Sequence, residues 1–135
     1  MTKIWDRLYL GDLKDAQLLA RSNPQRITAV ISLCREQAVN RAPEITYVHI
    51  PIPDSRPISA QKFEDVLFAI SIFVRRGKLL VHCLAGKSRS PILVAAWLHR
   101  CGYAGIDKAL AEIAEVRAIS PSQVLLRSAK ELSGK

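Results

Sequence analysis

The sequence predicts an α/β domain in which helices cover both faces of a mostly parallel central sheet. Short apolar stretches rich in β-branched residues alternate along the chain with stretches in which apolar residues recur every three or four positions. The strand-like stretches are almost entirely apolar, which is typical of parallel strands covered on both faces. The 135 residues, 49% of them hydrophobic and 24% charged, contain no repeat or low-complexity linker, so one domain spanning residues 1–135 is expected.

Four segments are expected to form strands: residues 7–10, 27–33, 46–50 and 79–82. Residues 27–33, Ile-Thr-Ala-Val-Ile-Ser-Leu, are nearly all apolar and rich in β-branched side chains. Pro51 ends the third strand, because proline has no N–H to donate to a neighbouring strand.

The expected helices are residues 15–21, 60–76, 92–100, 106–116 and 122–132. Ser59 is a suitable N-cap for the second of them, and Gly77 closes it. The first stops before Asn23 and Pro24, because a residue that precedes proline disfavours helical backbone. Parallel strands that alternate with helices bring their carboxyl ends to one edge of the sheet, where ligands of such folds bind.

Composition and charge indicate the cellular compartment and the class of partner. Three cysteines are too few for a disulfide framework, no signal peptide is visible, and the longest apolar run, residues 66–74, is far shorter than the roughly 20 residues that span a bilayer. A cytoplasmic protein without membrane insertion is expected. Twenty Lys and Arg against twelve Asp and Glu give a net charge of +8, which favours an anionic partner. The basic residues are scattered rather than in blocks, so no nucleic acid partner is expected, and nothing demands more than a monomer.

The chemistry is concentrated in residues 81–91, Val-His-Cys-Leu-Ala-Gly-Lys-Ser-Arg-Ser-Pro. A buried strand is expected to end at Cys83, and Arg89 to stand at the start of a helix. A short loop that closes onto a helix N-terminus turns several backbone N–H groups inward and forms a nest for an oxyanion. These N–H groups and Arg89 favour the thiolate form of Cys83, and the planar guanidinium binds two phosphate oxygens at once. The residues expected to bind the phosphate are Leu84, Ala85, Gly86, Lys87, Ser88 and Arg89.

The motif His-Cys-x-x-Gly-x-x-Arg-Ser resembles the signature loop of the cysteine-dependent dual-specificity protein phosphatases, small members of the protein tyrosine phosphatase superfamily. The resemblance extends over most of the chain. Residues 8–11 are similar to that family's opening strand, residues 90–98 to the helix after its loop, and residues 117–122 to its arginine-containing C-terminal stretch.

The resemblance implies a cofactor-free and metal-free phosphatase. In such an enzyme Cys83 forms a phosphocysteine intermediate, and Arg89 binds phosphate and stabilises the transition state. Ser90 assists the breakdown of the intermediate, and His82 supports the thiolate from behind.

A leaving alkoxide or phenoxide needs a proton, so a carboxylic acid is expected above the loop. Asp54 is the best candidate, because it lies in the loop after residues 46–50, at the carboxyl end of the sheet. Prolines on both sides of Asp54 limit the freedom of that loop. Glu64 and Asp65 fit less well, since they lie in the first turns of a helix, whose dipole already favours acidic residues. The alternative is that Asp54 has only a turn-forming role.

Substrate class is less sharply specified. The chain lacks the extensions that deepen the pocket of tyrosine-only phosphatases, so proteins phosphorylated on tyrosine, serine or threonine are the first expectation. Lys87 leaves phosphoinositides or other phosphate esters as the second, although the companion lysine of those enzymes is Leu84 here. The alternatives of other classes are a catalytically weak phosphate-binding module and a different cysteine enzyme such as a sulfur transferase or arsenate reductase. An RNA 5′-triphosphatase would suit the positive charge, but its usual loop asparagine is Ser88.

Cys34 is a possible redox partner of the nucleophile. It follows residues 27–33 as Cys83 follows residues 79–82, so if the two strands are neighbours the Cα atoms could come within the roughly 4.4–6.8 Å that a disulfide tolerates. A similar cysteine pairs with the nucleophile in some members of the family. An oxidised thiolate is protected from irreversible oxidation by such a disulfide. The alternative is that Cys34 only fills space under the loop, and Cys101 is a weaker candidate for the pairing.

Overall fold

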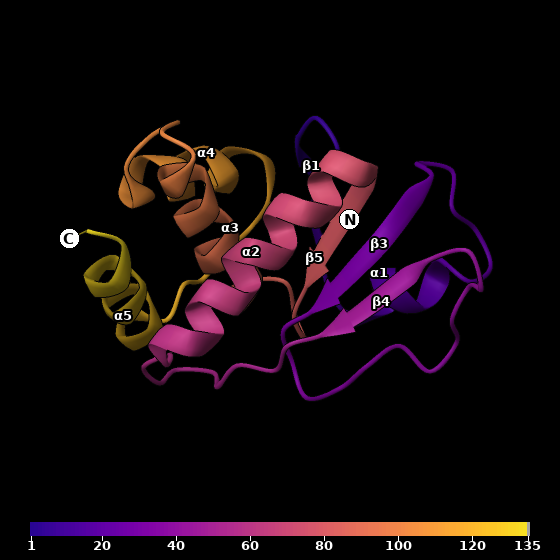
Figure 1. Cartoon of the computed structure of the whole chain (residues 1–135), viewed down its shortest axis with the longest axis horizontal. Coiled ribbons are helices and arrows are strands. Elements are labelled where there is room, and N and C mark those ends of the chain that lie inside the picture. The colour runs from indigo at the N-terminus through magenta and orange to yellow at the C-terminus, as the bar shows by residue number, and fades with distance from the viewer. Residues whose placement is uncertain (135) are drawn as a thin grey trace.

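The computed structural model describes residues 1–134 and shows a five-stranded sheet with the strand order β1-β2-β5-β3-β4 (Figure 1). The strands are β1 (Thr2–Trp5), β2 (Leu8–Gly11), β3 (Ile27–Ser32), β4 (Thr46–His49) and β5 (Lys78–His82). All neighbours pair in parallel except β1, which runs antiparallel to β2 at the edge of the sheet. The predicted α/β class with a mostly parallel sheet is therefore confirmed.

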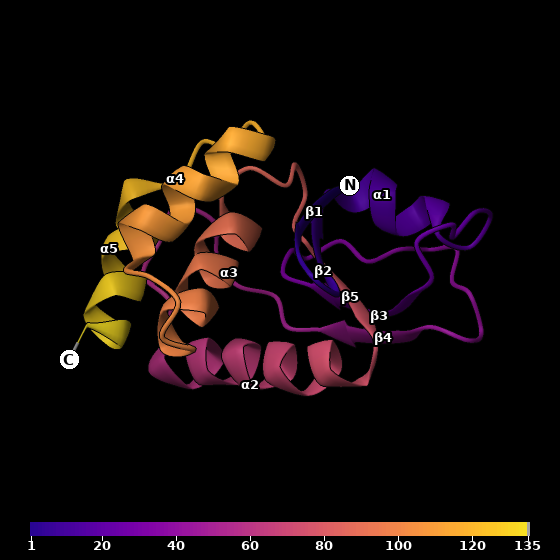
Figure 2. The same cartoon turned by 90° about the horizontal axis from the view of Figure 1, so that it is seen from above.

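Helices cover both faces of the sheet. The helices are α1 (Leu13–Leu18), α2 (Ala60–Arg76), α3 (Arg89–Arg100), α4 (Ile106–Val116) and α5 (Gln123–Ser133). Figure 2 shows α1 on the side of the sheet opposite to α2, with α4 and α5 packed beyond α3. The larger buried cluster joins the sheet to α2, α3, α4 and α5, and the smaller one joins it to α1.

The central strand β5 has both faces buried, and its side chains divide between these two clusters. Leu79 and Val81 point into the larger cluster, and Leu80 points into the smaller one. Successive strand residues point to opposite faces, so a strand placed between two cores must be apolar at every position. The uninterrupted Leu-Leu-Val run is therefore what places β5 in the middle of the sheet.

The structure differs from the sequence prediction at several element ends. Strand β1 was not predicted, because its residues alternate between partly buried and exposed and it borders the sheet on one side only. The first helix, which the sequence predicts at residues 15–21, starts earlier in the structure. It begins at Leu13 because Asp12 caps it, with Asp12 and Asp15 exchanging side-chain-to-backbone hydrogen bonds.

The other shifts are smaller. The strand predicted from residue 7 begins at Leu8, because Arg7 has a φ of 66° and belongs to the turn after β1. The helix predicted from residue 92 already begins at Arg89. This earlier start brings the guanidinium-bearing residue into the first turn of α3.

The carboxyl ends of β5, β3 and β4 meet at one edge of the sheet. Ser32 pairs with His82 on one side and with His49 on the other, so the three strands end level with one another. The segments 83–88, 33–45 and 50–59 leave the sheet at this edge. Within residues 1–134, no helix combines the length and apolar character needed to cross a membrane.

Candidate active site

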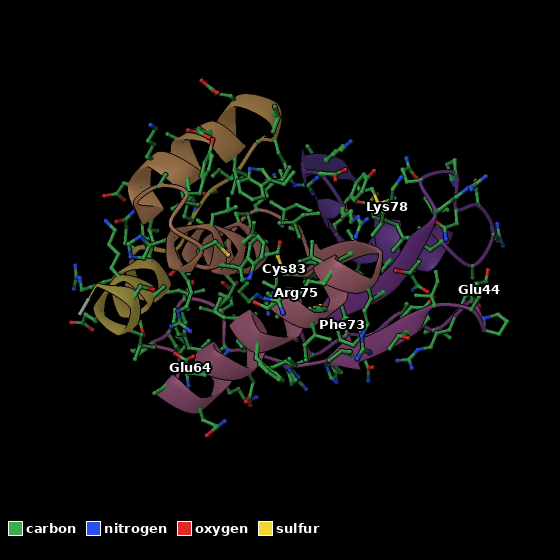
Figure 3. The ribbon with its side chains drawn as sticks, turned by 45° about the horizontal axis from the view of Figure 1, so that its top comes forward. Glu44, Glu64, Phe73, Arg75, Lys78 and Cys83 are labelled. Atoms are coloured by element: carbon green, nitrogen blue, oxygen red, sulfur yellow. The ribbon has the colours of Figure 1, made fainter. Side chains whose placement is uncertain are left out.

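Cys83 follows β5 directly and lies in the interior, with 2% of its surface exposed. Its Sγ is 3.3 Å from the Oγ of Ser90, a fully buried residue in the first turn of α3. In Figure 3, Cys83 lies near the middle of the molecule, whereas Glu44 and Glu64 project from its outside. The structure thus brings the candidate nucleophile and the candidate assisting serine into contact.

The loop from residue 84 to 88 is held by hydrogen bonds to its carbonyl groups from other parts of the chain. These bonds run from the Leu13 N–H to the Leu84 carbonyl (3.2 Å), from Arg117 Nε to the Gly86 carbonyl (2.9 Å) and from the Ser120 N–H to the Lys87 carbonyl (2.8 Å). Among residues 1–134, the backbone N–H groups of residues 84–89 donate to no protein acceptor. With the carbonyls occupied from outside, the N–H groups are left to bind an oxyanion.

Gly86 is required where it stands. Its φ is 69°, in the region that favours glycine, and a Cβ there would lie 2.6 Å from the Gly11 carbonyl oxygen and overlap the Arg117 guanidinium. Strand β2 and Arg117 therefore both press against this one position of the loop. A side chain at residue 86 would push the loop away from both.

Arg89 connects the loop to the neighbouring segment. Its Nη1 lies 3.5 Å from the carbonyl oxygen of Ile52, in the loop that carries Asp54. Helix α3 has no acidic residue in its first turn, so the positive helix end and the guanidinium stand together without a local carboxylate from that turn. This concentration of positive charge favours an anion above the loop.

Asp54 faces the same hollow as Arg89. The hollow has a volume of about 410 Å³, and its lining includes both residues together with Arg35 and Leu84. The Asp54 loop is held by the Ile52 N–H, which donates to the Leu33 carbonyl at 3.0 Å. The geometry therefore places a carboxyl group and a guanidinium on two walls of one cavity beside the nucleophile loop.

The two weaker candidates for the acid lie elsewhere. Glu64 forms an ion pair with Arg100, whose Nη1 is 2.6 Å from Glu64 Oε1, and Asp65 accepts a hydrogen bond from Gln61. Both belong to the exposed side of α2, and neither lines the hollow. Of the three acidic residues considered from the sequence, Asp54 is the one that lines the hollow with Arg89, and Glu36 lines it as well.

His82 lies beneath the loop and is fully buried. Its Nδ1 is 3.2 Å from the Cys83 carbonyl oxygen, and its Nε2 has no partner within residues 1–134. Burial lowers the pKa of His82, because the charged imidazolium loses its hydration. The unfolded chain therefore takes up this proton more readily than the folded one, so His82 lowers stability as the pH falls below the ordinary histidine range.

Cys34 is also completely buried, one strand away from the nucleophile. Strands β3 and β5 are neighbours, as a pairing of Cys34 with Cys83 requires, and the Leu33 N–H donates to the His82 carbonyl at 2.9 Å. The Sγ of Cys34 donates to the Glu36 carbonyl at 3.1 Å, and burial raises the pKa of this thiol. All three cysteines of the chain are free thiols.

Several contacts that hold the loop were not predictable from the sequence. Besides its bond to Gly86, Arg117 donates from Nη1 to the Oγ1 of Thr2 at 2.9 Å, which joins the loop to β1. The Ser122 N–H donates to the Oγ of Ser88 at 2.9 Å. The one signal for these contacts is the similarity of residues 117–122 to a family stretch, which does not specify what the stretch touches.

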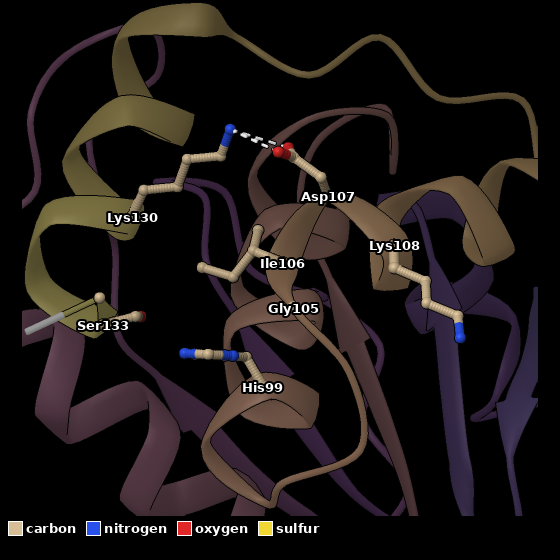
Figure 4. Close-up of a pocket in the computed structure, with 8 residues that line it drawn as sticks. His99, Gly105, Ile106, Asp107, Lys108, Lys130 and Ser133 are labelled. Atoms are coloured by element: carbon tan, nitrogen blue, oxygen red, sulfur yellow. Dashed lines mark hydrogen bonds and ion pairs between the residues drawn. The ribbon is translucent and has the colours of Figure 1, made fainter.

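A separate hollow of about 270 Å³ lies between the end of α3 and the start of α4 (Figure 4). His99 and Ser133 line it, and an ion pair between Lys130 and Asp107 of 2.8 Å crosses its rim. No residue of the loop from 83 to 89 lines this hollow. Within residues 1–134, no group of three or more His, Cys, Asp or Glu is arranged to hold a metal ion.

Known proteins are similar to this chain along most of its length. The family model described as "Dual specificity phosphatase, catalytic domain" matches residues 8–133. The chain is 32% identical over 120 residues to dual specificity protein phosphatase 22-A of Danio rerio, covering 87% of this chain and 57% of that protein. It is 34% identical over 122 residues to dual specificity protein phosphatase 15 of Mus musculus, covering 89% of this chain and 52% of that protein. The chain thus spans about half the length of these curated relatives.

Two solved structures are also similar. The crystal structure of DUSP15 superposes with a TM-score of 0.84 at 28% identity, over 98% of this chain and 86% of that one. The structure of human DUSP28 gives a TM-score of 0.84 at 23% identity, over 99% of this chain and 96% of that one, which supports the fold alone.

The crowding around Gly86 leads to a prediction with an internal control. Gly86→Ala is expected to lower stability by about 2 kcal/mol or more and to abolish phosphate binding, because it adds a clash to the backbone strain. Gly102 also has a positive φ, of 82°, but a Cβ there meets nothing within 4 Å. Gly102→Ala should therefore cost about 1 kcal/mol and leave phosphate binding intact. Urea unfolding and phosphate titration measure both effects, and equal behaviour of the two variants would show that the contacts at Gly86 do not shape the loop.

Proposed function

Because this chain belongs to the family of dual specificity phosphatase catalytic domains, we propose that it hydrolyses phosphate monoesters of proteins phosphorylated on tyrosine, serine or threonine. The observation that carries the proposal is the meeting of three features at one edge of the sheet. A buried thiol, Cys83, lies under a loop with unoccupied N–H groups, and Arg89 and Asp54 line the hollow beside it.

In the first step the Cys83 thiolate attacks phosphorus. A sulfur–phosphorus bond forms as the bond from phosphorus to the ester oxygen breaks, and Asp54 gives its proton to the departing oxygen. The N–H groups of residues 84–89 and the guanidinium of Arg89 bind the remaining phosphoryl oxygens. Their charges and dipoles are already in place, so they stabilise the transition state without reorganising.

In the second step water attacks the phosphocysteine. Asp54, now ionised, takes a proton from the water, and the sulfur–phosphorus bond breaks to release inorganic phosphate. The electron pair of that bond returns to Cys83. Ser90, whose Oγ is 3.3 Å from Sγ, is positioned to donate a hydrogen bond to the returning thiolate.

His82 has a supporting role in this scheme. A neutral ring in contact with the Cys83 carbonyl fixes the backbone just behind the nucleophile. It contacts neither the hollow nor the phosphate loop's N–H groups, so it is a positioning residue rather than a catalytic one.

We further propose that the protein works in the reducing environment of the cytoplasm, where its free thiols persist, and that oxidation regulates it. Peroxide would convert the Cys83 thiolate to a sulfenic acid, and attack by the Cys34 thiol would form a disulfide with loss of water. The adjacency of β3 and β5 supports this pairing. The pairing needs Cys34 Sγ to leave the Glu36 carbonyl.

The nucleophile and the guanidinium give the first test. Cys83→Ser should abolish turnover while phosphate still binds, because the substitution removes the thiolate and little volume. Arg89→Lys should lower kcat/KM by about 10² or more, since a point charge does not replace a bidentate fork. Rates on phosphotyrosine and phosphothreonine peptides, with circular dichroism as the folding control, measure both. A folded Cys83→Ser variant with substantial hydrolysis would contradict the mechanism.

The role of Asp54 predicts a dependence on the leaving group. Asp54→Asn should slow alkyl phosphates by about 10² and aryl phosphates with acidic leaving groups much less, because only the former need the proton. Asp65→Asn, on the exposed side of α2, is the matched control. Equal slowing of both ester classes would leave Asp54 with only its turn role.

Reversible oxidation tests Cys34. After peroxide and then thiol treatment, wild-type activity should recover, and mass spectrometry of the oxidised protein should show a peptide linking Cys34 and Cys83. Cys34→Ala should recover much less, whereas Cys101→Ala should match the wild type. Full recovery by Cys34→Ala without a linked peptide would reduce Cys34 to packing.

A further inference from the structure

A groove runs along α1, next to the candidate active site but outside it. It has a volume of about 480 Å³, larger than the hollow of about 410 Å³ beside Cys83. Its lining includes Leu13, Lys14, Gln17, Leu18, Arg21 and Val39, and we refer to it as the α1 groove.

The lining of the α1 groove is one hydrogen bond away from the lining of the hollow beside Cys83. Leu84 lines the catalytic hollow with 48% of its surface exposed. Its carbonyl accepts the hydrogen bond from the N–H of Leu13, the first residue of α1 and part of the groove's lining. This hydrogen bond joins a residue that lines one hollow to Leu84, the residue that follows Cys83 and lines the other hollow. A substrate whose phosphate lies over Cys83 can therefore reach the lining of the α1 groove by way of Leu84.

The groove offers an apolar surface. Leu18 is 55% exposed and Val39 82% exposed, although both are large apolar side chains. The Val39 wall is held in place by Gln17, whose Oε1 accepts hydrogen bonds from the N–H groups of Val39 (3.0 Å) and Asn40 (3.3 Å). The surface is therefore formed before anything binds, and covering it would remove apolar area from water.

Two cations border this apolar surface. Lys14 and Arg21 are exposed, and within residues 1–134 neither has a carboxylate within 4 Å. The nearest acidic neighbour in sequence, Asp15, is already engaged by the backbone of Asp12 and by the N-terminal amine. A ligand that matches both features of the groove is therefore a peptide segment with apolar and acidic side chains.

Resting on the proposed function, we infer that the α1 groove binds the part of a protein substrate that flanks its phosphorylated residue. An apolar side chain packs against Leu18 and Val39, and acidic side chains pair with Lys14 and Arg21. Helix α1 advances about 1.5 Å per residue, so Leu18 lies about 7.5 Å beyond Leu13 along the helix. An extended peptide advances about 3.3 Å per residue, so about two of its residues span the length from Leu13 to Leu18. Because at least one further residue must cross Leu84 first, we place these residues about three positions from the phosphorylated one.

The test compares two phosphotyrosine peptides with the same five-residue centre. One carries Leu and two Glu about three residues from the phosphotyrosine on both sides, and the other carries Ala and two Ser there. The wild type is expected to have a KM about fivefold lower for the acidic peptide, with similar kcat, and raised salt should shrink this difference. The small substrate p-nitrophenyl phosphate, which is too short to reach the groove, measures catalysis alone.

Charge reversal locates the effect. Lys14→Glu with Arg21→Glu should remove the preference for the acidic peptide. The matched control, Lys108→Glu with Arg127→Glu, makes the same change in net charge at exposed positions elsewhere and should keep it. Leu18→Ser tests the apolar contact without changing charge and should weaken binding of the acidic peptide about threefold. All three proteins should cleave p-nitrophenyl phosphate like the wild type.

The outcomes distinguish a failure of the proposed role of the α1 groove from a failure of the proposed function. A wild type that cleaves both peptides with equal KM, or a control that loses the preference as the groove variant does, overturns the groove. A short-chain phosphoinositide whose cleavage depends on Lys14 and Arg21, when peptide cleavage does not, also overturns it in favour of a lipid headgroup. A wild type that cleaves none of these phosphate esters overturns the proposed function itself.

Discussion

The site depends on hydrogen bonds that residues outside the loop donate to the loop's carbonyl groups. A loop of five residues between a strand and a helix has as many carbonyls as N–H groups, and an oxyanion is attracted only if the N–H groups face it. Leu13, Arg117 and Ser120 satisfy carbonyls of this loop from the outside. Within residues 1–134 the N–H groups of the loop are thus left without protein acceptors, as the proposed function requires of a phosphate site.

The sheet explains why these contacts meet at one place. Strand β5 lies between β2 and β3, so the turn after β2 and the turn after β3 flank the residue that follows β5. Leu13 enters from the first of these turns, and the Leu33 carbonyl holds the Asp54 loop from the second. The apolar run of β5 therefore does more than fill the core, because it sets which loops surround Cys83.

Much of this arrangement could be predicted from the sequence, and the limits are physical. Patterns confined to neighbouring residues, such as the buried strand before Cys83 and the glycine and arginine after it, are visible in the chain itself. Strand β1 is not, because an edge strand with one exposed face has a weak hydrophobic pattern. The contact of Arg117 with Gly86 is also invisible, since an arginine after a helix reads as a surface residue until the fold places it. The position of Asp54 was predictable only in part. The sequence indicates its loop, but whether Asp54 lines the same hollow as Arg89 depends on the three-dimensional path of residues 50–59.

The span of the Arg117 contacts has a consequence for how the protein acquires its activity. Its guanidinium joins Gly86, 31 residues earlier, to Thr2, 115 residues earlier. Contacts between such distant parts of a chain form late in folding, because each must first overcome the entropy of closing a long loop. The contact with Thr2 spans more of the chain than the pairing of β2 with β5, so we expect it to form after the inner strands have paired. The order matters for a reactive thiol, because an incompletely folded chain presents Cys83 as an ordinary cysteine, without the surroundings that turn it towards phosphate.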